Sequence, residues 1–571
     1  MQFPTLQQGS VSRESITRFG GLNACARIDE GEFAAMENGT GDYFPLAASR
    51  RKRGVYASPA ACHGLIAKDT LCWVAGSKFV MGSYETELHL TEGPKQLVSM
   101  GAYVVIFPDK KYINTADLTD FGNLETEFTS AGTVTFTPVD AGGEPLIPAY
   151  TQPEEPQEPE NGTLWLDNSG AGALMQWSAG SGMWVTVEST LVRIACPGIG
   201  AAFRPGDGVS LTGGPEGVAS QGVLADCGRD FVTLPGLLEG EQTVTEPVTV
   251  GRYVPNMDYV IECGNRLWGC RYGTSRSGAV VNEIYASKLG DFRNWSCFQG
   301  VSTDSYAVSL GADGCFTGAV QHLGYPVFFR EGCIHKIYGS YPAAFRLQTT
   351  PCPGVQQGSS GSLALLGQTL YYKSPGGVCA YDGAAPVDVS GKLGRMPYSA
   401  ASAGALGEKY YISMEDGAGN SHLLVYDARR GLWHREDGTR ARNFCACRGD
   451  LFFLDGQGRI ISIGGQGTPE DDFHWQLETG EIGGLSPDYK TLSRLNLSLE
   501  LEAGAEVTLA VSYDGEAEWR EIARISGGKR RMLALPVAVR RCEYLRLRLE
   551  GTGAMRLHGI TKTMEWGSDV P

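Results

Sequence analysis

The stretch GDLFFLDGQGRIISIGG (449–465) decides the fold, because it carries a complete strand–turn–strand phrase. Two apolar runs flank an Asp/Gly-rich turn, and another glycine precedes the first run. The same phrase begins at Gly324, Gly367 and Glu408, so four successive copies are separated by 43, 41 and 41 residues. A period of this size, with two central strands per unit, is typical of the four-stranded blade of a β-propeller.

Three further copies of the phrase begin near Asp69, Gly101 and Gly264, and seven hairpins predict a propeller of six to eight blades. One blade cannot cover both of its faces, whereas blades packed around an axis bury one another. The composition agrees, since the 571 residues include 77 glycines, 10% are aromatic and only 20% are charged. This mixture favours an all-β chain of short strands and tight turns over a helix bundle.

The repeat is interrupted between residues 127 and 258, where we predict an inserted small β-module. The insert contains a Pro/Glu-rich linker (148–162), expected to be extended and exposed. A hairpin after this linker carries Trp165, Trp177 and Trp184. These rings could stack on a sugar, but tryptophan on short strands more often forms the core of a small module.

From about residue 475 the chain alternates apolar and polar residues, as in Leu495, Leu497, Leu499 and Leu501. Such alternation indicates antiparallel strands with one face in water, and we predict a C-terminal antiparallel β-sandwich. The predicted domains are an N-terminal arm and propeller-closing segment (1–60), the first blades (61–126), the insert (127–258), the remaining blades (259–470) and the sandwich (475–571).

Motifs for catalysis and metal binding do not stand out in the sequence. The eight histidines are dispersed, and there is no zinc spacing, phosphate-binding glycine loop or GxSxG elbow. One near match to the Asp box of sialidase-type propellers occurs at Ser512–Gly515 with Trp519. Its glycine comes one position early, so we interpret Asp514-Gly515 as a type I′ turn. We therefore expect no enzyme activity, no cofactor and no bound metal, with a propeller glycosidase as the least favoured alternative.

The net charge of −16 argues against a protein that grips the phosphates of nucleic acid. Two dense basic runs, Arg50–Arg53 and Lys529–Arg531, are interpreted as solvated surface turns. The fifteen cysteines lack the spacing of a disulfide framework, which predicts free thiols. No stretch approaches eighteen apolar residues, so we expect no membrane span.

The segment NRLWGCRYGTSRSGAVVNEIYASKLGDFRNW (265–295) resembles a signature of tail nozzle, or packaged-DNA stabilisation, proteins of short-tailed bacteriophages. The opening of the chain, including Glu37-Asn38, resembles the start of the same proteins. The residues that match the signature are Asn265, Arg266, Leu267, Asn282, Glu283, Tyr285, Ser287, Leu289, Gly290, Asp291 and Trp295.

The resemblance implies a structural protein of a phage virion that assembles as a homo-oligomeric ring, usually a hexamer. Such a ring lies below the portal and adaptor, contacts other tail proteins, extends the DNA channel and retains or gates packaged DNA. Double-stranded DNA passes through it without sequence-specific binding, and the location is the phage tail, assembled in the bacterial host cytoplasm. A tail-tip or host-adsorption protein, binding a receptor or glycan through the three tryptophans and the sandwich, stays open as an alternative.

Overall fold

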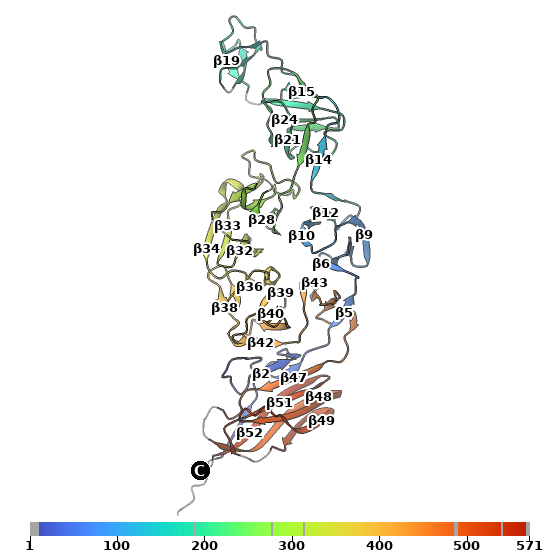
Figure 1. Cartoon of the computed structure of the whole chain (residues 1–571), viewed down its shortest axis with the longest axis vertical. Coiled ribbons are helices and arrows are strands. Elements are labelled where there is room, and N and C mark those ends of the chain that lie inside the picture. The colour runs from blue at the N-terminus through green and yellow to red at the C-terminus, as the bar shows by residue number, and fades with distance from the viewer. Residues whose placement is uncertain are drawn as a thin grey trace, which may run out of the picture. The chain divides into compact units, whose positions relative to one another are not determined.

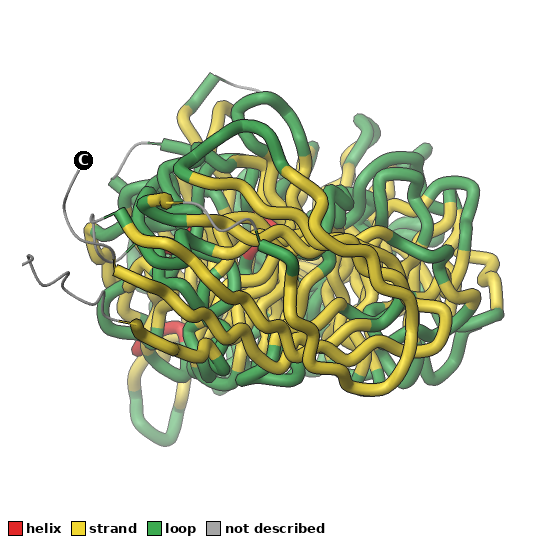
Figure 2. The backbone as a smooth tube through the Cα atoms, turned by 90° about the horizontal axis from the view of Figure 1, so that it is seen from below, coloured by secondary structure: helices red, strands yellow, loops and turns green. Residues whose placement is uncertain are grey.

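The computed structural model describes residues 11–170, 172–187, 190–275, 278–311, 314–484, 489–537 and 541–566. Figure 2 shows strands joined by turns, and helix among these residues is limited to short 3-10 turns. None of the described helices is long and apolar enough to cross a membrane. The chain divides into two compact units, Met1–Pro94 with Phe328–Ile334 and Thr349–Pro571, and Lys95–Val327 with His335–Gln348. The 3-10 turns are Pro342–Ala344, Ser360–Ser362 and Gly391–Leu393.

Seven sheets of four or five strands form the blades of the propeller, which confirms the predicted fold (Figure 1). Each predicted hairpin supplies a pair of neighbouring strands in one blade. In the first unit, three blades follow one another along the chain and a fourth precedes them. The strand β5 (Gly54–Ala57) joins the last blade by pairing with β45.

The blades of the first unit are β6 (Cys62–Ala67), β7 (Leu71–Ala75), β8 (Lys78–Met81) and β9 (Tyr84–His89); β35 (Ala364–Leu366), β36 (Thr369–Lys373), β37 (Val378–Tyr381) and β38 (Val387–Asp388); β39 (Ser399–Leu406), β40 (Lys409–Glu415), β41 (Ser421–Asp427) and β42 (Leu432–Arg435); and β43 (Arg442–Cys447), β44 (Asp450–Leu454), β45 (Ile460–Ser462), β5 and β46 (Thr468–Pro469). The second unit contains β10 (Gln96–Met100), β11 (Tyr103–Phe107), β12 (Lys111–Asn114) and β13 (Phe121–Asn123); and β27 (Tyr259–Glu262), β28 (Leu267–Thr274), β29 (Val280–Ala286) and β30 (Tyr306–Ser309). The blade β31 (Gly318–His322), β32 (Tyr325–Arg330), β33 (Cys333–Tyr338) and β34 (Arg346–Pro351) has residues in both units.

The glycines at the start of the repeated phrase are required by backbone conformation. Gly101, Gly264, Gly324, Gly367 and Gly449 have φ angles of 56°, 63°, 79°, 63° and 78°, in the left-handed region. A Cβ atom added to any of them would meet nothing within 4 Å. The tight turn between two strands therefore selects glycine here because other L-residues are strained at positive φ.

A second kind of turn closes two of the blade hairpins. Asp416 and Asp455 each accept backbone N–H bonds at Oδ1 from the residues two and four positions later, all at 2.9 Å. The third residue after each aspartate is a glycine with positive φ, Gly419 at 83° and Gly458 at 80°. The Asp-x-x-Gly spacing visible in the sequence is thus a self-capped hairpin turn.

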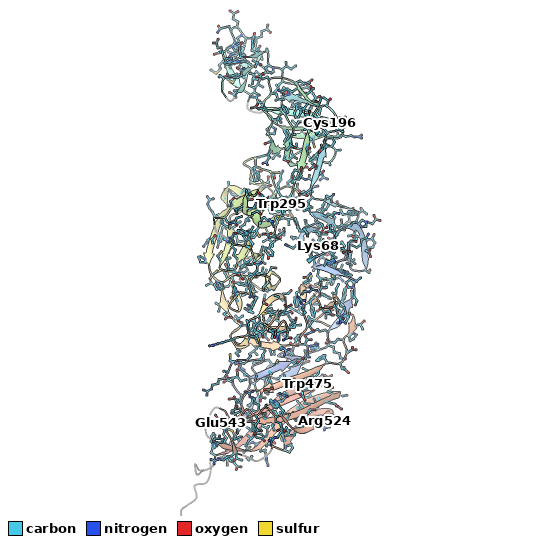
Figure 3. The ribbon with its side chains drawn as sticks, in the orientation of Figure 1. Lys68, Cys196, Trp295, Trp475, Arg524 and Glu543 are labelled. Atoms are coloured by element: carbon cyan, nitrogen blue, oxygen red, sulfur yellow. The ribbon has the colours of Figure 1, made fainter. Side chains whose placement is uncertain are left out.

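The insert contains two facing sheets and a third sheet. Its main core contains Val134, Phe136, Ile194 and Val232, all fully buried, and Figure 3 marks Cys196 in the same module. One sheet has the order β14-β26-β21-β22, the second β23-β24-β20-β15-β25 and the third β16-β17-β18-β19. The strands are β14 (Thr126–Thr129), β15 (Val134–Val139), β16 (Tyr150–Thr151), β17 (Leu164–Asp167), β18 (Ala173–Ser178), β19 (Met183–Thr186), β20 (Leu191–Ala195), β21 (Gly208–Thr212), β22 (Gln221–Val223), β23 (Asp226–Gly228), β24 (Phe231–Pro235), β25 (Gln242–Val244) and β26 (Thr249–Arg252).

The C-terminal strands predicted as an antiparallel sandwich form one ten-stranded sheet, and strands from the beginning of the chain complete it. The alternating leucines of β48 and β51 are buried, and Figure 3 shows Trp475 among these strands. Strand β48 pairs with β52 over residues 490–501 and with β51 over residues 506–513. The strands are β1 (Val11–Ile16), β2 (Phe33–Glu37), β3 (Gly39–Thr40), β4 (Ala47–Ser49), β47 (His474–Thr479), β48 (Lys490–Tyr513), β49 (Arg520–Leu535), β50 (Arg541–Cys542), β51 (Leu545–Thr552) and β52 (Met555–Trp566).

The structure tests three local predictions, on the turn at Asp514-Gly515, the cysteines and the Pro/Glu-rich linker. Asp514 and Gly515 have φ angles of 48° and 75°, and Glu516 N–H donates to Tyr513 O at 2.8 Å, which confirms the type I′ turn. All fifteen cysteines are free thiols, as predicted. The linker differs from expectation because β16 within it pairs with β17, and Pro156 is buried while the neighbouring glutamates are exposed.

We expect Gly367→Ala to lower the free energy of unfolding by about 1–2 kcal/mol, because alanine is strained at positive φ. The matched control is Gly376→Ala in another turn of the same blade, where a Cβ also meets nothing but φ lies outside the left-handed region. That change should leave the stability unchanged or slightly higher. Urea unfolding followed by tryptophan fluorescence compares the two, and equal losses would contradict the explanation.

Candidate functional site

The signature segment forms two turns that are bonded to each other. Asn265, in the turn before β28, has a φ of 59°, and its N–H donates to Glu262 Oε1 at 2.8 Å. The carbonyl of Asn265 accepts the N–H of Gly290 at 2.9 Å, and Gly290 itself has a φ of 74°. The Asn-Arg-Leu and Leu-Gly-Asp parts of the signature therefore meet in space, although 25 residues of sequence separate Asn265 from Gly290.

Arg266 is buried and uses its guanidinium group to hold backbone carbonyls. Its Nη1 donates to Ser287 O at 2.7 Å and to Asp304 O, and its Nη2 donates to Ser302 O at 2.9 Å. The hydroxyl of Ser287 in turn accepts the N–H of Leu267 at 3.0 Å. Burial lowers the pKa of Arg266. Through these hydrogen bonds Arg266 stabilises the conformation of the loop between β29 and β30.

The other signature residues divide into buried supports and one exposed side chain. Asn282 donates to Leu310 O at 2.9 Å, the Tyr285 hydroxyl donates to Glu283, and the buried Trp295 donates to Phe292 O at 2.9 Å. Figure 3 labels Trp295, which belongs to the same hydrophobic cluster as Leu267. Leu289 alone among the large apolar signature residues is 40% exposed.

The Leu-Gly-Asp turn also fastens the insert to its blade. Asn294 Nδ2 donates to Asp291 Oδ2 at 2.5 Å and to Asp207 Oδ1 of the insert at 3.0 Å, while its Oδ1 accepts Gly208 N–H at 3.1 Å. Asp207 is paired with Arg252 at 2.5 Å, and both side chains are almost fully buried. A buried carboxylate is stable only with such partners, so these residues fix how the insert is held on the blade.

The three tryptophans of the insert lie together on its third sheet, β16-β17-β18-β19. The rings of Trp165 and Trp184 are 5.2 Å apart and those of Trp177 and Trp184 are 5.4 Å apart, both edge to face. Trp165 is buried and its Nε1 donates to Gln152 O in the Pro/Glu-rich linker at 2.9 Å. Trp177 and Trp184 are half-buried, so the edge-to-face packing covers part of their ring surfaces.

The basic run Arg50–Arg53 is not the solvated turn that we expected, and sequence inspection missed its role. Arg50 and Arg53 are buried, whereas Arg51 and Lys52 between them are exposed. The guanidinium of Arg53 pairs with Glu436 and, at 3.0 Å, with Asp437. Arg50 pairs with Glu470 and lies 3.9 Å from the ring centroid of Phe473.

Charge in this network is balanced by close pairing. Burial opposes the charge of Arg53, but the carboxylates of Glu436 and Asp437 outweigh burial and raise its pKa. Burial likewise opposes the charge of Asp437, and Arg53 outweighs it and lowers the pKa of that carboxyl. Both groups therefore stay charged at neutral pH, which a buried pair with additional hydrogen bonds permits.

Asn38, from the opening phrase that the resemblance includes, lies at the centre of this network. It has a φ of 52°, which asparagine tolerates better than most residues. Its Nδ2 donates to His474 O at 2.7 Å, its Oδ1 accepts Arg50 Nε at 2.6 Å, and its N–H donates to Glu436 O. Asn38 thus joins the end of β2 to the start of β47 and to the segment after β42.

The second basic run, Lys529–Arg531, is also not a turn, since it lies within β49 with Arg531 exposed. Among the described residues, no group of three or more His, Cys, Asp or Glu side chains is arranged to hold a metal ion.

Comparisons with known proteins reach only solved structures. No protein-family model matches the sequence, and no curated protein does. An exo-β-1,3-galactanase from Phanerochaete chrysosporium with galactose is 10% identical, covers 53% of this chain and 95% of its own, and has a TM-score of 0.20. A family 43 arabinoxylan arabinofuranohydrolase from Bacillus subtilis with cellotetraose is 8% identical, covers 54% and 95%, and scores 0.21. A Trypanosoma rangeli sialidase is 7% identical, covers 96% and 95%, and scores 0.23.

These comparisons correct one expectation. The sequence had led us to expect no enzyme, whereas the matched structures are glycoside hydrolases. The exclusion of enzyme activity is therefore withdrawn. At such low identities and TM-scores the likeness supplies no substrate, site or mechanism for this chain.

We expect Asn294→Ala to loosen the insert, because it removes a hydrogen bond to the buried Asp207 and one to the Gly208 amide. The loss should be about 2 kcal/mol, corresponding to roughly thirtyfold more frequent local opening. Limited proteolysis with peptide mapping measures it as faster cleavage within the insert.

The matched control is Asn282→Ala, which removes a buried bond to Leu310 O within the blade. It should destabilise the blade without preferential cleavage of the insert. Identical cleavage patterns for the two variants would show that Asn294 does not fasten the insert.

Proposed function

We propose that the chain is a structural protein of a bacteriophage virion, a nozzle or hub subunit of the tail. In this role it forms a homo-oligomeric ring, expected to be a hexamer, below the portal and adaptor. The ring extends the DNA channel and retains or gates packaged double-stranded DNA. Its location would be the phage tail, after assembly in the host cytoplasm.

The observation that carries the proposal is the structural use of the residues behind the resemblance. Asn38, Arg266, Gly290 and Asp291 serve turns, buried loops and the attachment of the insert. The residues that this chain shares with the tail nozzle family therefore stabilise the fold. Sharing them supports a relationship to that family of structural subunits. The net charge of −16 also suits a surface that DNA passes without adhering.

An exposed apolar patch supports contact with another subunit. Phe298 is 61% exposed, Val301 49% and Tyr341 46%, and the three residues line one cleft of about 410 Å³. Leu289 of the signature adjoins the same loop, since its N–H donates to Thr303 O at 2.9 Å. Apolar groups gathered in this way on a surface are commonly covered in an assembly.

The test is the assembly state of the purified chain and its place in the particle. Native mass spectrometry and negative-stain images should show a closed ring, and Val301→Asp should dissociate it because a charge enters the apolar contact. The control Val387→Asp changes an exposed valine on β38, outside this patch, and should leave the ring intact.

A chain that stays monomeric, and that is absent from the tail axis in images of the particle, would contradict the proposal. Release of reducing sugar from a polysaccharide by the purified chain would instead favour a glycoside hydrolase.

A further inference from the structure

A polar cleft of about 450 Å³ lies in the first unit, beside the basic run Arg50–Arg53. It is of a size that suits a small ligand. Its walls come from the blade β39–β42, from the segment around β3 and from the basic run. The lining residues that matter for its chemistry are Asp42, Lys409, Tyr411, Asp427, Arg430 and His434.

Most charges of this cleft are already paired. Lys409 pairs with Asp42, Arg430 pairs with Asp427, and Arg53 pairs with Glu436. The rest of the charged lining is Arg50, Arg51, Lys52 and Glu408, so the lining has six basic and four acidic residues. A ligand of either charge would therefore meet groups of its own sign beside their ion-pair partners.

Two buried polar side chains of the cleft have unused hydrogen-bonding capacity. Tyr411 is 6% exposed and His434 is 4% exposed. Within the part of the chain that the structure describes, neither the Tyr411 hydroxyl nor a ring nitrogen of His434 makes a hydrogen bond to protein. Neither residue is among the described ones with a fully buried, unpaired polar atom, so these polar atoms open into the cleft and can bond to its water or to a ligand.

His434 offers both a donor and an acceptor at neutral pH. Burial, reinforced by Lys409, lowers the pKa of His434 to about 4, so the ring is uncharged. A neutral imidazole carries one N–H and one bare nitrogen. The ring fits its place because residue 41 is glycine, where a Cβ atom would come within 2.6 Å of His434 Nε2.

We propose that this cleft binds a neutral polyhydroxylated ligand, a monosaccharide or one unit of a glycan. Sugar hydroxyls both donate and accept, as Tyr411, His434 and the paired charged groups do, and they can replace the bonds of cleft water. The inference goes beyond the structural role proposed above and does not depend on it.

The experiment is saturation-transfer NMR and calorimetry on the full chain, with the methyl glycosides of glucose, galactose, xylose and arabinose as probes. Glucuronic acid and glucosamine serve as charged comparisons. We expect at least one neutral glycoside to bind more tightly than both charged sugars. Tyr411→Phe should weaken this binding about tenfold, because it removes one hydroxyl that the ligand would use.

Tyr410→Phe is the matched control on the same strand. The Tyr410 hydroxyl donates to Ser362 O at 2.7 Å away from the cleft, so its loss should lower the melting temperature and leave sugar binding unchanged. Tyr411→Phe should leave the melting temperature unchanged. The proposal is overturned if no neutral glycoside binds, if a charged sugar binds more tightly, or if Tyr411→Phe binds as well as the original chain.

Discussion

The first unit depends on two arginines that enter its interior from a four-residue connection. The segment between β4 and β5 leaves the C-terminal sheet and joins the last blade, and its first and last residues are buried cations. Removing a partner from a buried ion pair costs about 3–5 kcal/mol, since it leaves a charge without compensation. Glu436, Asp437 and Glu470 supply that compensation from the segments that follow β42 and β46. These ion pairs therefore fix the connection between the C-terminal sheet and the last blade.

A buried ion pair also links two parts of the second unit. Asp207 and Arg252 of the insert form this pair, and Asn294 of the blade donates a hydrogen bond to Asp207. In both places a charged or amide side chain from a loop is buried and fully bonded. Hydrophobic cores explain why each sheet forms, whereas these polar networks specify how a strand, loop or module is attached. Polar networks that fix these attachments suit a protein whose proposed task is to keep one shape within an assembly.

Local sequence signals predicted the propeller well. The repeated phrase begins every 41 to 43 residues, and the glycines at positive φ in its turns act within a few residues of sequence. The Asp-x-x-Gly turns at Asp416 and Asp455 are equally local. The burial and ion pairing of Arg50 and Arg53 could not be predicted from local signals, because their carboxylate partners lie about 380 to 420 residues further along the chain. The strands β1, β2 and β4 could not be predicted for the same reason, since they pair with the C-terminal strands β52 and β47.

The candidate site was predicted only in part. The resemblance identified the signature residues, but their roles depend on the contact between the turns at Asn265 and Gly290, which are distant in sequence. The three tryptophans pack against one another, a contact that the sequence analysis did not specify. The polar cleft with Tyr411 and His434 had no sequence signal, because it depends on glycines and charges from distant segments.

The central claim is that buried polar bonds from loops fix the architecture, and hydrogen–deuterium exchange of the intact chain tests it most directly. The amide of Arg53 donates to Glu470 Oε1 at 2.8 Å and that of Gly208 donates to Asn294 Oδ1 at 3.1 Å. The account predicts that both exchange as slowly as the amides of central blade strands, such as Phe453 in β44. Exchange of these two amides at the rate of an exposed turn, such as that at Gly417, would contradict it.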